Sequence, residues 1–297
     1  MGHSTKWIFF LFAAFLFFGG LTAGGARAEN DSRLHVSVSI QPQAFFVERI
    51  GGDRVKVDVM VQPGQSPHTY APTPKQMVRL AGAKAYFRVG VPFENGFITK
   101  LKSTVPGIAI IDTSRGIALE NMPVHDIGEE EEHHDGELDT HTWLDPMLVK
   151  KQAAIIRDSL SELDPAGRSS FENNFNRFAG ELDDLHSRLA QALAPVKGKS
   201  FFVFHPAFGY FARAYGLNQV AVETGGKQPS ARHLAQLIEK ARKQEVKVLF
   251  VQPQFSTKSA ETIARAIDGA VVPLDPLARD YIANMETIAT AMEKALR

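Results

Sequence analysis

A long, evenly spaced series of apolar residues near the middle of the chain constrains the fold most strongly. Between Pro165 and Ala194 the apolar residues recur at steps of three and four, which places them on one face of a helix; they are Phe171, Phe175, Phe178, Leu182, Leu185, Leu189 and Leu193. Asp164 is a suitable N-cap residue, and Pro165 suits the first helical position. Roughly thirty residues at about 1.5 Å each span roughly 45 Å, which is longer than a helix inside a small domain needs. We therefore predict a rigid helix over 164–195 that joins two lobes.

Strand-like and helix-like patterns take turns on both sides of this helix. Stretches typical of strands lie at 34–40, 55–61, 83–89, 108–112, 200–204, 219–222, 246–251 and 270–274. Helical stretches lie at 44–50, 75–81, 97–103, 146–163, 208–215, 230–243, 257–267 and 279–296. Strands that alternate with helices pair in parallel through crossover helices. The sequence therefore predicts an α/β protein with parallel sheets, an N-terminal lobe over 29–163 and a C-terminal lobe over 196–297.

The first 28 residues have the pattern of an export signal. Lys6 precedes an apolar core over 7–18, and the small residues Ala26 and Ala28 suit a cleavage site. The alternative is a membrane anchor, but the apolar core is shorter than the roughly 20 residues that span a bilayer. The chain has no cysteine that could carry a lipid. We expect a periplasmic protein without a lipid anchor, cleaved after Ala28.

The charge balance argues against a polyanionic partner. The chain has 33 basic and 33 acidic residues, and the leader contains Lys6 and Arg27 but no acid. The remainder is thus slightly acidic, and it gives no electrostatic reason to bind nucleic acid or an anionic membrane.

Four metal-capable side chains stand where a strand or loop meets the next element: His68, His141, His205 and Asp275. Ligands of open parallel sheets bind beyond the carboxyl ends of the strands. Two of these residues precede the long helix and two follow it, as a site between lobes requires. Three imidazoles and one carboxylate can surround Zn²⁺, whereas Mg²⁺ and Ca²⁺ prefer oxygen ligands. Spacing alone is weak evidence for a metal site, and a buried structural role for His205 and a capping role for Asp275 stay open.

The sequence motifs around these residues resemble those of one protein family. The segments 63–74, 139–146, 204–211, 252–255 and 274–277 read PGQSPHTYAPTP, DTHTWLDP, FHPAFGYF, QPQF and LDPL. In this order they resemble the metal-binding solute receptors of zinc and manganese ABC importers, the cluster A-I solute-binding proteins. The resemblance covers essentially the whole chain after the leader.

This resemblance implies two Rossmann-like lobes joined by one long helix, with a cation held in the cleft between them. It also implies that His68, His141, His205 and Asp275 are the ligands. Manganese-type members usually have a carboxylate at the third position, so His205 favours Zn²⁺ as the transported ion. The expected partner is the membrane permease of a zinc ABC importer, and the receptor is expected to be a monomer without enzymatic activity.

Three positions depart from the family pattern. Gln76, Gln252 and Ala71 stand where relatives often have an acid. None of them is one of the four ligand positions, so the surroundings of the site are expected to differ rather than the site itself.

An acidic, histidine-rich stretch interrupts the N-terminal lobe at about 121–140. It contains His125, His133 and His134 beside a run of glutamates, and so many charges predict a solvated loop. The stretch resembles the charged insertion of zinc-type receptors, which makes the three histidines candidates for an auxiliary metal site. A solvated loop that merely tolerates these residues is the equal alternative.

Two other functions fit some of the same residues. A manganese- or iron-type receptor is one, and a zinc-dependent hydrolase with Asp275 as its base is the other. The sequence contains no His-Glu-x-x-His or nucleophile-elbow motif, which disfavours the hydrolase.

Overall fold

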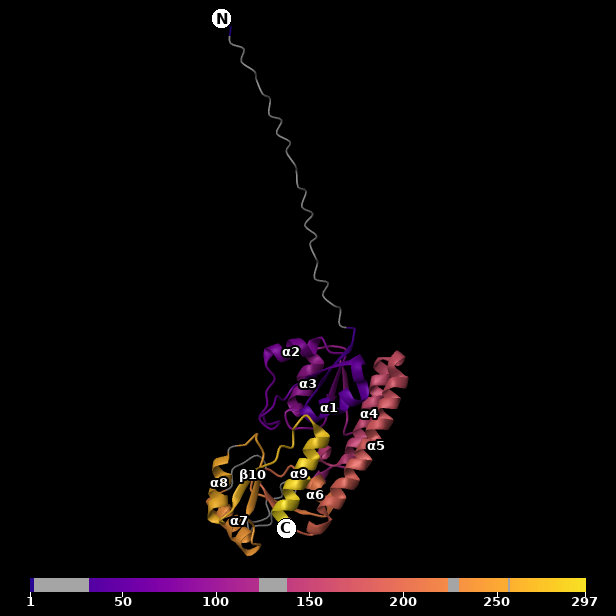
Figure 1. Ribbon diagram of the computed structural model, residues 1–297. Helices are drawn as coiled ribbons and strands as arrows, with labels where there is room; N and C mark the ends of the chain where they lie inside the picture. The colour runs from indigo at the N-terminus through magenta and orange to yellow at the C-terminus, as the bar shows by residue number, and fades with distance from the viewer. Residues whose placement is uncertain (3–31, 123–137, 224–229, 256) are drawn as a thin grey trace. The chain divides into compact units, whose positions relative to one another are not determined.

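The computed structural model describes residues 1–2, 32–122, 138–223, 230–255 and 257–297 (Figure 1). Residues 3–28 of the predicted leader and most of the predicted charged loop, including His125, His133 and His134, lie outside these residues. Residues Arg33–Arg297 form one unit by their internal contacts, and all the helices and strands belong to it.

Two four-stranded sheets form the centres of the two lobes. The first has the order β2-β1-β3-β4, with β1 at Leu34–Val38, β2 at Val55–Val59, β3 at Ala85–Arg88 and β4 at Ala109–Asp112. The second has the order β10-β9-β7-β8, with β7 at Ser200–Val203, β8 at Asn218–Ala221, β9 at Val248–Val251 and β10 at Ala270–Pro273. All pairings in both sheets are parallel, which confirms the predicted α/β class.

Helices connect and cover these strands. Those of the first lobe are α1 at Gln41–Gly51, α2 at Pro74–Ala81 and α3 at Glu94–Thr104. Those of the second are α6 at Gly209–Tyr215, α7 at Ala231–Lys243, α8 at Thr257–Ala266 and α9 at Tyr281–Leu296. Between them lie α4 at Pro146–Leu163 and α5 at Arg168–Leu193, side by side in Figure 1.

Successive side chains of a strand pack in different apolar cores, because neighbouring residues of a strand face opposite sides of the sheet. In β3, Phe87 packs in the core that contains α1, α4 and α5, whereas Tyr86 packs with residues of α2 and α3. In β7, Val203 joins the same core as Phe87, whereas Phe202 packs with α7 and α8. One core therefore continues from the first lobe to the second.

The long helix α5 carries this shared core. Its predicted apolar stripe is buried, apart from the half-buried Phe175. The side chain of Asn174 donates to Ile50 O of α1 at 2.9 Å, and Arg188 Nε donates to Glu286 of α9 at 2.9 Å. The helix thus contacts both lobes, as the sequence predicted.

The start of the long helix differs from the prediction. Residues Pro165–Gly167 form a 3₁₀ turn, and the α-helix begins at Arg168. Asp164 stands at the N-cap of this turn but makes no side-chain capping hydrogen bond, and its carboxylate accepts a hydrogen bond from Arg54 Nε at 2.7 Å. That hydrogen bond lowers the pKa of Asp164.

A short antiparallel ladder also lies where the sequence predicted only a loop. Strand β5 at Glu120–Asn121 pairs with β6 at Leu138–Asp139. Two residues per strand are too few for a periodic signal in the sequence. The ladder holds the chain just before His141.

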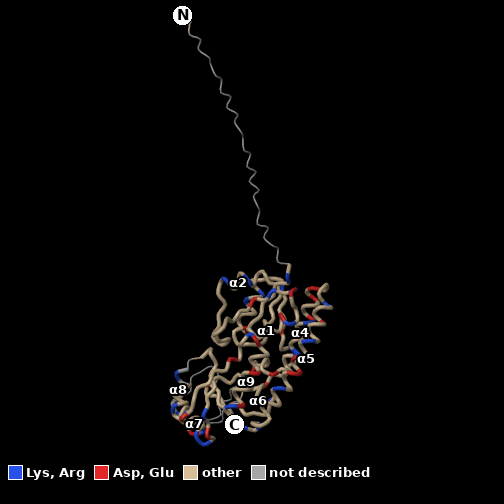
Figure 2. Tube along the Cα trace, in the orientation of Figure 1, with Lys and Arg blue, Asp and Glu red and all other residues tan. Residues whose placement is uncertain are grey.

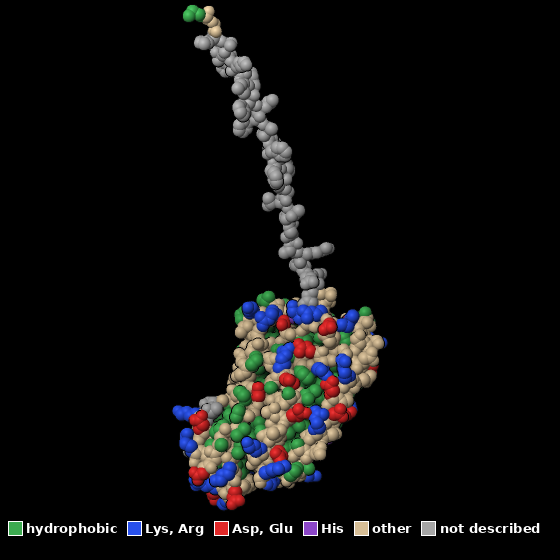
Figure 3. Space-filling model, in the orientation of Figure 1, with side chains coloured by type: hydrophobic (Ala, Val, Ile, Leu, Met, Phe, Trp, Pro, Cys, Tyr) green, Lys and Arg blue, Asp and Glu red, His purple; other side chains and the backbone are tan. Residues whose placement is uncertain are grey.

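Charged side chains of both signs intermix over the surface. Lysines, arginines, aspartates and glutamates follow one another along α4 and α5 in Figure 2, and the face drawn in Figure 3 carries both signs. Among the described residues, no helix has the length and apolar character needed to cross a membrane.

Replacing Leu182 by alanine should destabilise the shared core. Leu182 lies on α5 with no exposed surface, and a Leu→Ala change in a packed core costs about 2–5 kcal/mol. Urea unfolding of the metal-free protein measures this loss. Replacement of the exposed Gln191 of the same helix by alanine is the control and should leave the unfolding midpoint nearly unchanged. Equal midpoints for the two variants would contradict the role of α5.

Candidate metal centre

Three histidine side chains from the two lobes meet at one point. His68 lies in the loop between β2 and α2, His141 follows β6, and His205 follows β7. Nε2 of His205 lies 3.2 Å from Nε2 of His68 and 3.4 Å from Nε2 of His141. Two nitrogens bound to one tetrahedral Zn²⁺ would lie about 3.3 Å apart at the usual bond lengths. The spacing therefore suits such an ion.

Buried carboxylates hold the far nitrogens of two of these rings. His141 Nδ1 lies 2.8 Å from Asp139 Oδ1, and His205 Nδ1 lies 3.1 Å from Glu223 Oε2. All four side chains are buried. Because a carboxylate accepts, each imidazole donates from Nδ1, which leaves the Nε2 lone pair facing the cluster. Both rings are thus oriented for a metal before one arrives.

Sequence reasoning missed the role of both carboxylates. Asp139 entered only as part of the motif around His141, and Glu223 was not singled out. The available signal for Glu223 was its place directly after the strand predicted at 219–222, at the same sheet edge as His205.

Two glutamines at positions that depart from the family pattern bind backbone groups. Gln252 Nε2 donates to His205 O at 2.6 Å, and its Oε1 accepts from His205 N at 3.1 Å. Gln76 forms a capping box with Thr73 at the start of α2, and its Nε2 donates to Met60 O at 2.7 Å. An ionised acid at either position could not donate. The amides therefore fit these places, and Gln252 fixes the backbone of His205.

Apolar side chains enclose the cluster. The ring of Phe255 stacks on His205 with 4.9 Å between centroids. Trp143 Nε1 donates to Pro276 O at 2.8 Å, which ties the segment of His141 to the second lobe. The apolar lining consists of Pro67, Val91, Pro92, Trp143, Phe255, Pro276 and Leu277.

The carboxylate of Asp275 is not part of the cluster in this structure. The group of described residues whose ligand atoms lie within 4.8 Å of one another is His68, His141 and His205. Asp275 Oδ1 accepts from Gln254 Nε2 at 2.8 Å and from Leu277 N at 2.9 Å. Both of these hydrogen bonds fall on Oδ1. The neighbouring residue Pro276 lines the cavity, so Asp275 lies beside the site.

Two imidazoles of the cluster, those of His68 and His205, are held in the neutral form. Burial, followed by the neighbouring His205 and His141, lowers the pKa of His68 to about 3. Burial also lowers the pKa of His205, although its hydrogen bond to Glu223 opposes this. A neutral imidazole is the form that binds a metal. These two rings stay available to a cation at a lower pH than the value of about 6.5 for a free histidine suggests.

Three imidazoles brought together between two α/β lobes form a group that could hold a metal ion, and the fold is that of a two-lobed α/β protein with parallel sheets. The chain belongs to the ZnuA family, described as zinc-uptake complex component A, periplasmic, whose family model matches residues 36–295.

Individual relatives agree with this assignment. The high-affinity zinc uptake system protein ZnuA of Bacillus subtilis is 31% identical over 290 residues, which cover 92% of this chain and 89% of that protein. The crystal structure of a ZnuA deletion mutant with zinc bound has a TM-score of 0.82 and 41% identity, covering 89% of this chain and 98% of that one.

One group of relatives is longer than this chain. The zinc-binding lipoprotein AdcA of Streptococcus pneumoniae is 29% identical over 289 residues, which cover 93% of this chain but 57% of that protein. The chain thus spans little more than half the length of these relatives.

The lowered pKa values predict how acid affects the metal-free protein. The unfolded chain takes up protons on His68 and His205 below about pH 6.5, whereas the folded chain resists protonation there, so the stability that these rings contribute is lost as the pH falls. Urea unfolding between about pH 8 and about pH 5 should show this decline. The His68→Asn variant should show a shallower decline, and parallel curves for the two proteins would contradict the prediction.

Proposed function

We propose that this protein captures Zn²⁺ between its lobes and delivers it to the membrane permease of an ABC importer. The observation that carries this proposal is the approach of three Nε2 atoms from both lobes, two of them backed by buried carboxylates. Membership of the ZnuA family supports it.

Capture requires little rearrangement of the chain. The arriving ion would lose water ligands, and the Nε2 atoms of His68, His141 and His205 would take their places. Asp139 and Glu223 would keep the rings of His141 and His205 in position. Asp275 would supply the fourth ligand through Oδ2, because Gln254 and Leu277 already bind Oδ1. One carboxylate oxygen and three nitrogens complete the tetrahedron that Zn²⁺ prefers.

The shared core restricts how the ion is released. The helix α5 packs against α1 of the first lobe and α9 of the second. Wide hinge bending would have to break this continuous core, so release to the permease is expected to use local movement of the ligand-bearing loops.

Export follows from the leader. We propose that residues 1–28 direct the chain to the periplasm and are removed after Ala28. The relative from Streptococcus pneumoniae is named a lipoprotein. The intact mass of the protein recovered from cells decides both the cleavage site and whether a lipid is attached. We also propose that the receptor acts as a monomer.

Replacing His205 by alanine should weaken zinc binding by at least about a hundredfold, because the central ring of the cluster is lost and Glu223 is left without its imidazole. Competition titration with a zinc chelator, on protein without a His tag, measures the change. His35→Ala is the control, since His35 binds Asp58 outside the cluster. Deletion of residues 126–136 should cost far less, as the charged loop is proposed only as an auxiliary site through His125, His133 and His134. A loss as large as that of His205→Ala would reverse this ranking.

The Asp275→Asn variant tests the fourth ligand. Loss of the anionic oxygen should weaken zinc binding by at least about tenfold and change the visible spectrum of the Co²⁺-substituted protein. Unchanged affinity and spectrum would mean that three histidines bind the ion and leave a position open, as catalytic zinc sites do. In that case zinc-dependent hydrolysis of a simple ester becomes the experiment that separates a receptor from a hydrolase.

A further inference from the structure

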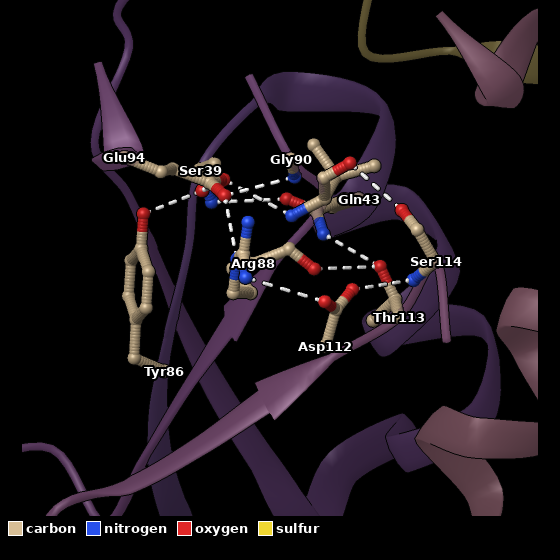
Figure 4. Close-up of polar contacts among 10 residues, drawn as sticks. Ser39, Gln43, Tyr86, Arg88, Gly90, Glu94, Asp112, Thr113 and Ser114 are labelled. Carbon is tan, nitrogen blue, oxygen red and sulfur yellow. Dashed lines mark hydrogen bonds and ion pairs between the residues drawn. The ribbon is translucent and has the colours of Figure 1, made fainter. Parts of the chain in front are cut away.

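The carboxylate of Glu94 is completely buried in the first lobe, although it does not touch the histidine cluster. Glu94 is the first residue of α3 and has no exposed surface. Its Oε1 accepts from Ser39 Oγ and from Val89 N, the latter at 3.0 Å. Its Oε2 accepts from Arg88 Nε at 3.0 Å and from Gly90 N at 2.8 Å (Figure 4). Four donors thus converge on one carboxylate, as a buried charge requires.

Two of these donors are the backbone amides of Val89 and Gly90, the two residues that follow β3. Gly90 has a φ of +95°, a conformation that favours glycine. The carboxylate of Glu94 therefore fixes the path of residues 89–93, which form the segment between β3 and α3.

The segment 89–93 bonds the neighbour of His68 and lies close to the neighbour of His141. Phe93 N donates to Pro67 O, the residue before His68, at 3.3 Å. On the other side, a methyl group in place of the Gly90 hydrogen would lie 3.5 Å from Cγ2 of Thr140, the residue before His141. Val91 and Pro92, between these two contacts, line the cavity beside the cluster.

Further hydrogen bonds hold the start of this segment through its backbone carbonyl groups. Ser114 Oγ donates to Val89 O at 2.7 Å, and Thr113 Oγ1 donates to Arg88 O at 2.8 Å (Figure 4). Arg88 also reaches Asp112 at 3.3 Å. The end of β3 is thus held from both sides, and Glu94 is the group that binds its amides.

We propose that Glu94 is a positioning residue for metal capture: it fixes the segment 89–93, and through it the imidazoles of His68 and His141, in the arrangement that meets His205. This inference rests on the proposed function, since it assumes that the three imidazoles bind Zn²⁺.

The Glu94→Gln variant removes this function with almost no change of volume. Each carboxylate oxygen of Glu94 accepts from two donors. The amide nitrogen of glutamine therefore points at two donors in either orientation, one of them a backbone N–H of the segment. Zinc affinity is expected to fall about tenfold, the low end for groups that orient metal ligands. The visible bands of the Co²⁺-substituted protein should shift as well.

Tyr86→Phe provides a matched control in the same network. The Tyr86 hydroxyl is buried and bonds Ser39 Oγ at 2.5 Å, so its removal disturbs the network but leaves Val89 N and Gly90 N on the carboxylate. Both variants should unfold at lower urea concentration than the parent protein. Only Glu94→Gln should change the zinc affinity and the Co²⁺ spectrum.

Hydrogen exchange supplies a measurement that needs no metal. In the metal-free protein, the peptide that covers 86–93 should exchange faster in Glu94→Gln than in the parent, while Tyr86→Phe should leave its protection nearly unchanged. If Glu94→Gln does not fold, Gly90→Ala takes its place, because the side chain strains the same segment and leaves Glu94 intact. It should weaken zinc binding in the same direction.

The outcomes separate this inference from the proposed function. Parent-like zinc affinity and Co²⁺ spectrum in a folded Glu94→Gln protein overturn the positioning role, as does an equal effect of Tyr86→Phe on both. If instead the parent protein binds no zinc, or binds it as well after His205→Ala, the proposed function fails first and the inference fails with it.

Discussion

The site depends on holding three imidazoles together in an apolar setting, with Nε2 of His205 within 3.4 Å of Nε2 of each of the other two. Burial lowers the pKa of His68 and of His205, and the lowered pKa keeps these two rings neutral. Neutral rings could still turn either nitrogen toward the centre. The carboxylates of Asp139 and Glu223 decide this, because they accept the Nδ1 protons and direct Nε2 inward. The chain thus prepares a set of lone pairs before the cation is present.

The core around α5 makes this preparation possible across two lobes. Ligands from separate lobes stay at the distances that one ion requires only if the lobes cannot move apart. Here one apolar core runs from Phe87 of β3 through Leu182 of α5 to Val203 of β7. The contact of Trp143 with Pro276 adds a direct link beside the cluster. The network around Glu94 acts in the same way inside the first lobe, where it joins the end of β3 to the segment that bears His68.

The prediction succeeded where the signal was local and repeated. The stripe of α5 and the alternation of strands and helices follow from periodicity over neighbouring residues, and both appear in the structure. It failed where a distant partner intervened. Asp164 pairs with Arg54 instead of capping the helix, and β5 and β6 are too short to leave a periodic trace. The boundaries of the lobes at 163 and 195 stay a prediction, since the apolar core continues through them.

The amino-acid sequence by itself determined the fold class, the long helix and the three histidines, because each depends on residues that are close together in the chain or on motifs that can be read in order. Only the tertiary structure decided which carboxylate faces which ring, that Gln252 grips the backbone of His205, and that Gln254 and Leu277 hold one oxygen of Asp275. The reason is physical. A hydrogen bond between groups such as His205 and Glu223, or Glu94 and Ser39, exists only after packing has brought separate strands to one sheet edge.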